Sequence, residues 1–232
     1  MRLAVLETGV PPGHLHQRFG GYPAMFEALL GLGPLETFDV QKGQWPGAPS
    51  DHDAYLVTGS PAGVYDPLPW IDELMAFLRA AKGQAALVGV CFGHQVMAQA
   101  FGGQVIKSPK GWGVGLHSYG VEAHRPWMDQ KPAVALSASH QDQVVELPPD
   151  TTVLAGSDFC PNGLLAYDDL SMSCQLHPEF APEFSIALIE GRRGSRIPDE
   201  QAAQAVESLK APDDHERIAG WMARFLENEP SR

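Results

Sequence analysis

The chain has 232 residues, of which 44% are hydrophobic and 19% are charged, a composition typical of a globular protein with a sizeable core. Its 16 basic and 28 acidic side chains give a formal net charge of −12. Because such a surface repels phosphate backbones and anionic lipids, we expect neither nucleic acid nor a membrane as a partner.

The N-terminal sequence MRLAVLETGV predicts a first strand and no signal peptide, because its apolar run is cut short by Glu7 and Gly9. No apolar run approaches the roughly 20 residues that a membrane span needs. The three cysteines, Cys91, Cys160 and Cys174, are too few and too scattered for a disulfide framework. We therefore expect the reducing cytoplasm as the location of the protein.

Strands and helices alternate in the first half of the chain. Short apolar runs predict strands at 2–8, 36–40, 54–58 and 85–90, and helical spacing predicts helices at 24–30, 70–81 and 92–101. This alternation predicts an α/β fold, with a mostly parallel central sheet and helices on both faces.

The second half is richer in glycine, proline and short β-like runs, from about residue 103 to residue 168. Runs at 133–137 and 152–154 predict a small antiparallel addition to the sheet. A further strand is expected at 171–176, followed by helices at 182–190, 200–209 and 215–226. Since the chain contains no internal repeat or low-complexity linker, we expect a single domain over residues 1–232, with 191–232 as a helical tail.

A cysteine between two glycines, Gly89-Val90-Cys91-Phe92-Gly93, lies between a predicted buried strand and a predicted helix. A nucleophile at such a turn needs small neighbours, because the backbone is strained and crowded. The helix N-terminus favours the thiolate, and the Phe92 N–H would face a developing oxyanion. The alternative is a buried structural cysteine in a glycine-rich turn.

A base and a group to orient it are supplied by His177-Pro178-Glu179 at the end of a predicted strand. Proline favours an extended conformation for His177, which places Glu179 on the same side of the chain. Glutamate can then accept from one ring nitrogen while the other faces the thiol. A lone histidine is more often a satisfied core or surface residue, but its combination with the cysteine turn favours a Cys–His–Glu triad.

Two further features lie near this predicted triad. The turn Thr58-Gly59-Ser60-Pro61 ends a strand and can offer backbone N–H groups to an oxyanion, although it could equally be an ordinary turn. Gln95 follows Cys91 by one helical turn and so faces the same site, unless it is simply a solvated helix residue.

Together these motifs and Ser139-His140-Gln141-Asp142 resemble those of class I (triad-type) glutamine amidotransferases, above all the amidotransferase domain of GMP synthetase and its free-standing relatives. The resemblance covers roughly residues 1–190 and implies a flavodoxin-like fold. It implies Cys91 as nucleophile, His177 as base, Glu179 as its orienter, Gly59 and Phe92 as the oxyanion hole, and Gln95, Ser139, His140, Gln141 and Asp142 as glutamine contacts.

The chain departs from this family at two positions. Many relatives have two glycines before the proline of the oxyanion loop, where this chain has Gly59-Ser60, and the intracellular-protease-like branch usually has histidine where this chain has Phe92. Residues 13–22 resemble a loop that leads to the first helix in free-standing members, and residues 64–70 could form the facing rim of the pocket or a hydrophobic staple.

Neither a metal nor a cofactor is expected. His14 and His16 could be two metal ligands, but no cysteine or acidic cluster completes a site.

The expected reaction is hydrolysis of the γ-amide of glutamine or of a related γ-glutamyl compound through a γ-glutamyl thioester. One use of this reaction is as the glutaminase component of an amidotransferase whose synthetase is a separate chain, since residues 191–232 contain nothing that resembles a phosphate-binding loop. The alternatives are a stand-alone γ-glutamyl peptide hydrolase, which must accommodate a bulky leaving amine, and a catalytically silent binding module, which the presence of all three triad residues disfavours.

Overall fold

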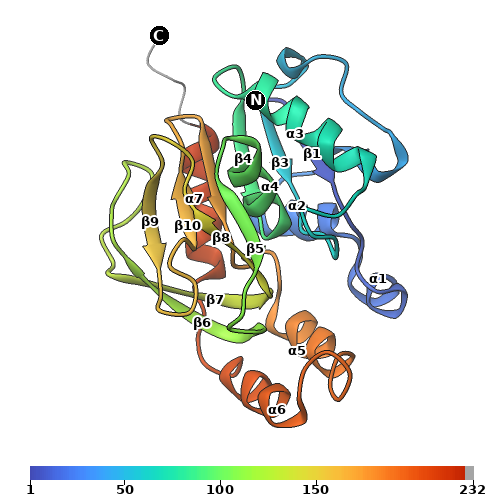
Figure 1. Cartoon of the computed structure of the whole chain (residues 1–232), viewed down its shortest axis with the longest axis vertical. Helices are drawn as coiled ribbons and strands as arrows, with labels where there is room; N and C mark the ends of the chain where they lie inside the picture. Colours follow the sequence, from blue (N-terminus) through green and yellow to red (C-terminus); the bar gives the residue numbers. More distant parts are fainter. Residues whose placement is uncertain (228–232) are drawn as a thin grey trace.

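The computed structural model describes residues 1–227 (Figure 1). In the first half, strands and helices alternate: β1 (Leu3–Glu7), α1 (Gly13–Phe19), α2 (Tyr22–Leu30), β2 (Glu36–Asp39), β3 (Ala54–Val57), α3 (Pro69–Ala81), β4 (Ala86–Val90) and α4 (Phe92–Ala100). The second half begins with strands: β5 (Gln104–Lys107), β6 (Gly113–Val121), β7 (Ala133–His140), β8 (Asp142–Glu146), β9 (Thr152–Gly156), β10 (Leu164–Ala166) and β11 (Ser171–Cys174). Three helices follow: α5 (Pro182–Glu190), α6 (Asp199–Ser208) and α7 (His215–Glu227).

The central sheet has the strand order β2-β1-β3-β4-β11-β10-β9-β6-β7. The strands from β2 to β11 run parallel, whereas β10 pairs antiparallel with both β11 and β9, and β6 pairs antiparallel with β7 and β9. β5 and β8 form a separate antiparallel pair. The predicted α/β fold with an antiparallel addition is therefore confirmed, and most of the antiparallel strands extend the central sheet itself.

Helices cover both faces of the parallel strands, because successive side chains of a strand point to opposite faces. Leu3 and Val5 of β1 pack into one buried cluster with residues of α2 and α7, while Ala4 and Leu6 pack into another with residues of α3 and α4. The indole of Trp221 on α7 is fully buried in the first cluster. The predicted C-terminal helices therefore pack on the sheet, whereas residues 228–232 of the predicted domain lie outside the described part of the chain.

The predicted loop over residues 13–22 is wrong, because residues 13–19 form the helix α1. Its apolar side chains pack against α5, with Leu15 in a buried cluster and the ring of Phe19 edge-on to that of Phe184 at 5.4 Å. This tertiary contact stabilises a helix that is too short to show a clear apolar period. Gly20 ends the helix with a φ of 83°, a value that favours glycine.

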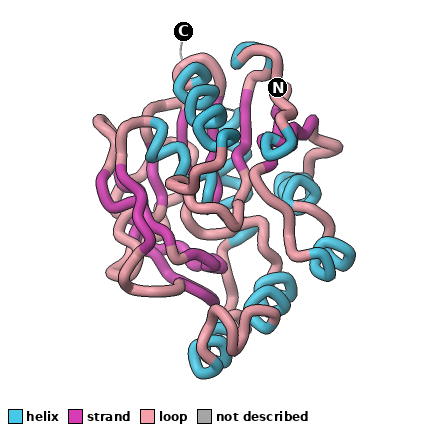
Figure 2. Tube along the Cα trace, turned by 45° about the vertical axis from the view of Figure 1, so that its right-hand side comes forward, coloured by secondary structure: helices cyan, strands magenta, loops and turns pink. Residues whose placement is uncertain are grey.

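Helices α5 and α6 lie together beneath the antiparallel strands β6 and β7, at the bottom of the molecule in Figures 1 and 2. The turn between them starts directly after Glu190 and ends at Pro198, the N-cap of α6. Ile197 buries its side chain beside Val114 of β6 and so anchors this turn to the sheet. Among residues 1–227, no helix combines the length and the apolarity needed to cross a bilayer.

Candidate active site

Cys91 occupies the sharp turn between β4 and α4. Its backbone has φ 54° and ψ −102°, a left-handed conformation that is rare for a residue with a side chain. A Cβ on Gly89 would lie 2.5 Å from the Gly93 carbonyl oxygen, and one on Gly93 would lie 2.3 Å from the Val57 carbonyl oxygen. The close approach of these backbones explains why both flanking positions are glycine.

Hydrogen bonds to neighbouring strands fix this turn. The Cys91 N–H donates to the Cys174 carbonyl of β11 at 2.8 Å, and the Gly93 N–H donates to the Thr58 carbonyl at 3.1 Å. Cys91 is only 7% exposed and lies at the N-terminus of α4, where the helix dipole favours a negative charge.

His177 and Glu179 follow β11 and meet Cys91 at the carboxyl edge of the sheet. His177 Nδ1 donates to Glu179 Oε1 at 2.8 Å, and the His177 ring and the Cys91 side chain lie together in the lining of one cavity. The His177 N–H also donates to the Ser137 carbonyl at 2.9 Å, and its ring stacks on Phe180 at 3.9 Å. Backbone, carboxylate and aromatic contacts together orient the imidazole toward the sulfur.

The pKa of His177 is raised above its ordinary value of 6.5. Burial disfavours the imidazolium, but the adjacent charges of Cys91 and Glu179 and the hydrogen bonds to both favour it and outweigh the burial. The site is therefore suited to a protonated imidazole held between Cys91 and Glu179.

The loop after β3, with Gly59, is held against Cys91 by a residue that sequence reasoning missed. Thr8 lies just after β1 and belongs to no recognisable motif. Its N–H donates to Thr58 Oγ1 at 3.0 Å, and its hydroxyl donates to the Thr58 carbonyl at 2.9 Å. A Cβ on Gly59 would lie 3.3 Å from His177 Cε1, so glycine permits the close approach of the imidazole. The Ser60 hydroxyl accepts a hydrogen bond from the Ala62 N–H at 3.2 Å, so this side chain stabilises the loop to which it belongs.

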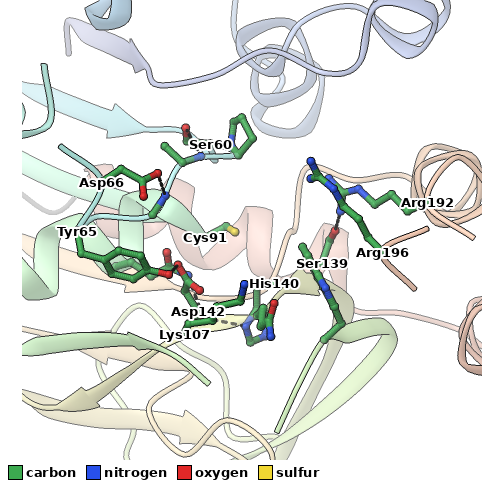
Figure 3. Close-up of a pocket in the computed structure, with 16 residues that line it drawn as sticks. Ser60, Tyr65, Asp66, Cys91, Lys107, Ser139, His140, Asp142, Arg192 and Arg196 are labelled. Atoms are coloured by element: carbon green, nitrogen blue, oxygen red, sulfur yellow. Dashed lines mark hydrogen bonds between the residues drawn. The ribbon is translucent and has the colours of Figure 1, made fainter. Parts of the chain in front are cut away.

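A cavity of about 500 Å³ opens beside Cys91, with the sulfur near its centre (Figure 3). All five side chains that the family resemblance implied as glutamine contacts line it, namely Gln95, Ser139, His140, Gln141 and Asp142. They come together because β7 ends at His140 and β8 begins at Asp142, directly across from the helix that carries Gln95.

Two of these residues mainly order the cavity wall. The Gln95 amide donates to the Asp142 carbonyl at 3.0 Å and to Gln175 Oε1 at 3.1 Å. His140 is 3% exposed, and its Nδ1 donates to the Asp142 carbonyl at 3.1 Å. Burial lowers the pKa of His140 to about 3, so its ring is neutral.

The opposite rim is formed by the segment after the Gly59 loop, as the sequence reasoning allowed. Tyr65 and Asp66 line the cavity, and the Tyr65 hydroxyl donates to Asp142 Oδ2 at 2.9 Å. Burial raises the pKa of the Asp142 carboxyl, although the Tyr65 hydrogen bond opposes this. Tyr65 and Asp142 thus form one side of the cavity in Figure 3.

Two arginines that sequence reasoning missed form the other side. Arg192 and Arg196 lie on the turn between α5 and α6, and Arg192 Nη1 donates to Ser139 Oγ at 2.8 Å (Figure 3). Both also line a second cavity of about 400 Å³, which adjoins Cys91 on the side of His177. The only sequence signal was the arginine-rich segment 191–198 in an otherwise acidic chain.

The remaining residues singled out in the sequence lie outside these cavities. His14 and His16 are exposed on α1, so they line neither cavity. Cys160 and Cys174 are buried, and burial raises the pKa of the Cys160 thiol to about 11.

Comparison with known proteins places the chain in a family. The family model described as "Glutamine amidotransferase class-I" matches residues 36–186. A protein of Schizosaccharomyces pombe named as glutamine amidotransferase-like is 25% identical, covering 97% of this chain and 98% of its own length. Gamma-glutamyl peptidase 3 of Arabidopsis thaliana is 26% identical over 86% of this chain and 85% of its own. A glutamine-hydrolyzing GMP synthase subunit of Methanopyrus kandleri is 33% identical, over 42% of this chain and 53% of its own.

Among solved structures, a glutamine amidotransferase from Methylobacillus flagellatus superposes with a TM-score of 0.74 at 21% identity, covering 97% of this chain and 93% of that one. This likeness shows a shared fold. The family model covers the strand-and-helix core that carries Cys91, Gly59 and His177. The chain therefore belongs to the class-I glutamine amidotransferase family, whose members are amidotransferases or hydrolases.

Proposed function

We propose that this protein hydrolyses the γ-amide bond of a γ-glutamyl compound by way of a γ-glutamyl thioester on Cys91. The observation that carries the proposal is the contact of one buried imidazole, His177, with both the Cys91 side chain and Glu179. A thiolate paired with an imidazolium is an activated nucleophile with its proton donor already in place.

In the first step the Cys91 sulfur attacks the γ-carbonyl carbon and forms a C–S bond. The negative charge that develops on the carbonyl oxygen is stabilised by the N–H groups of Gly59 and Phe92. The C–N bond then breaks, and the departing nitrogen takes the proton from His177. The products of this step are a free amine, a neutral imidazole and a γ-glutamyl thioester.

In the second step a water molecule attacks the thioester carbonyl and gives a proton to the neutral His177. The C–S bond breaks, the sulfur leaves as a thiolate, and glutamate is released. Glu179 holds Nδ1 of His177 throughout, so that Nε2 faces the reacting atoms in both steps. Gln95 and the Ser139–Asp142 segment hold the amino and carboxylate ends of the glutamyl group.

Two uses of this chemistry differ in the leaving group. The glutaminase component of an amidotransferase releases ammonia for a synthetase on another chain, a use favoured by the likeness to a GMP synthase component. A stand-alone hydrolase releases an amino acid or peptide, a use favoured by the gamma-glutamyl peptidase relative, which matches about twice as much of this chain. We place the stand-alone hydrolase first.

The test measures glutamate release from glutamine and from γ-glutamyl dipeptides by the purified chain without a partner. We expect brisk dipeptide cleavage that Cys91→Ser abolishes and that the control Cys160→Ser retains. Activity only after a synthetase is added would favour the glutaminase component. If the folded wild-type protein releases no glutamate and does not react with a thiol-directed glutamine analogue, it is a binding module and the proposal is refuted.

A further inference from the structure

The two cavities share Cys91, Arg192 and Arg196 in their linings but differ in which reacting group they contain. Only the second, of about 400 Å³, is lined by His177. Because the departing nitrogen must reach the His177 proton, the leaving group enters this second cavity while the glutamyl part occupies the first. An ammonia molecule, like a water molecule, fills only about 30 Å³. The second cavity is thus roughly ten times larger than ammonia requires.

The lining of this second cavity has an apolar part and a cationic part. Val10, Pro12 and Leu188 form an apolar wall, and Arg192 and Arg196 form the cationic edge. None of the described residues that line it is acidic, in contrast to the first cavity, where Asp66 and Asp142 lie opposite the arginines. A leaving group that carries an apolar side chain and a negative charge complements these walls.

Neither cationic side chain is neutralised within the described part of the protein. No carboxylate of residues 1–227 lies within 4.0 Å of the Arg192 or Arg196 guanidinium, whereas Arg193 on the same turn is paired with Glu190 at 2.6 Å. Two arginines without an acidic partner among residues 1–227 are unexpected at one site in a chain with a net charge of −12. Guanidinium groups bind planar carboxylates through paired hydrogen bonds.

The turn that carries these arginines is well ordered. Arg192 donates to Ser139, and its guanidinium lies 5.5 Å from the centre of the Trp112 ring. The Arg196 and Ile197 N–H groups both donate to the Arg192 carbonyl, at 3.0 and 3.1 Å, which brings Arg196 beside Arg192. The buried Ile197 side chain fixes the turn to the sheet.

We propose that Arg192 and Arg196 bind the carboxylate of the leaving group, so that the preferred substrates are γ-glutamyl amino acids with an apolar side chain. This inference rests on the proposed amide cleavage and adds its specificity. The inference also agrees with the extent of the family match. The family model covers residues 36–186, and more than half of the residues that line the second cavity lie outside that range. The reaction chemistry thus comes from the shared core, and the choice of leaving group comes from flanking segments.

The test compares two substrates that differ only in this charge, γ-glutamyl-leucine and γ-glutamyl-leucinamide. Arg196→Gln is the main variant, because Arg196 is exposed at the cavity edge. Arg193→Gln is the matched control, since it removes an arginine of the same turn that is paired outside the cavity. Arg196→Lys keeps the charge but loses the paired geometry.

We expect Arg196→Gln to lower kcat/KM for the acid on the order of 10- to 100-fold and for the amide by less than about 3-fold. Arg196→Lys should fall between wild type and Arg196→Gln on the acid, and Arg193→Gln should match wild type on both substrates. Equal losses on acid and amide would mean that the arginines act on the glutamyl part, and no loss on either would mean that they are solvated. Either result overturns the inference.

The failure of this inference is distinguishable from that of the proposed function. If the wild-type chain hydrolyses glutamine but neither dipeptide, the amide cleavage stands and the leaving-group site is refuted. If it hydrolyses none of the three and is not labelled by a glutamine analogue, the proposed function itself fails.

Discussion

The backbone of Cys91 allows a prediction that depends on the turn alone and not on catalysis. Its φ of 54° and ψ of −102° are accessible to glycine but strained for a residue with a Cβ. Strain of this kind costs about 1–3 kcal/mol. Both Cys91→Ala and Cys91→Gly lack the sulfur and therefore its pairing with His177. The difference in their free energies of unfolding therefore isolates the backbone strain.

Glycine has its own cost, because it loses about 0.5–1 kcal/mol more conformational freedom on folding than alanine. The ψ value lies far from the ordinary left-handed well, which places the strain toward the upper part of its range. We therefore expect Cys91→Gly to be more stable than Cys91→Ala by about 1–2 kcal/mol. For a chain of this size, each kcal/mol corresponds to roughly 2–4 °C in Tm.

The assay is urea denaturation of both variants at one pH, with the midpoints compared at equal slope. Calorimetry of the same samples provides a second measurement of the difference. If Cys91→Ala is as stable as Cys91→Gly or more stable, the turn is not strained and the argument for a nucleophile turn loses its geometric basis.

Two further predictions concern the same corner of the molecule. Gly93→Ala should destabilise the fold by about 1–3 kcal/mol in thermal melts, because its Cβ would lie 2.3 Å from the Val57 carbonyl oxygen. The control Gly13→Ala, whose Cβ would meet open space, should be neutral or slightly stabilising in the same melts. The raised pKa of His177 should fall toward 6.5 in Cys91→Ser, as NMR titration of the ring would report, and an unchanged titration would contradict the pairing.

The direction of the His177 shift also sets its effect on stability. Because the folded-state pKa is raised, its contribution to stability is fully present below the unfolded-state value of about 6.5 and is lost as the pH rises through the folded-state pKa. The wild-type protein should therefore lose stability relative to Cys91→Ser on the alkaline side. If the wild-type protein instead becomes more stable relative to Cys91→Ser as the pH rises, the result would contradict this account.

Much of the fold was predictable because its signals are local. Buried parallel strands such as β4 appear as short uninterrupted apolar runs, and α3 shows a regular apolar face. α1 was not predictable, since its seven residues are helical only through packing on α5, which lies far along the chain.

The candidate site divides in the same way. The glycines around Cys91 and the short spacing of His177 and Glu179 are local patterns whose chemistry can be inferred before the fold is known. Arg192 reaches the site only because β7 places Ser139 beside the turn after α5. Thr8 holds the Gly59 loop through a hydrogen bond to Thr58, fifty residues away in the chain, and a hydroxyl at a strand end is too common to signal such a role.

The most direct test of the central claim is the detection of the γ-glutamyl thioester itself. Glu179→Gln should slow both chemical steps by weakening the orientation of His177, and so lengthen the time over which the intermediate can be trapped. After a rapid acid quench of this variant with γ-glutamyl-leucine, peptide mass spectrometry should locate one glutamyl adduct on Cys91. Turnover without any adduct, or an adduct on Cys160 or Cys174, would contradict the account.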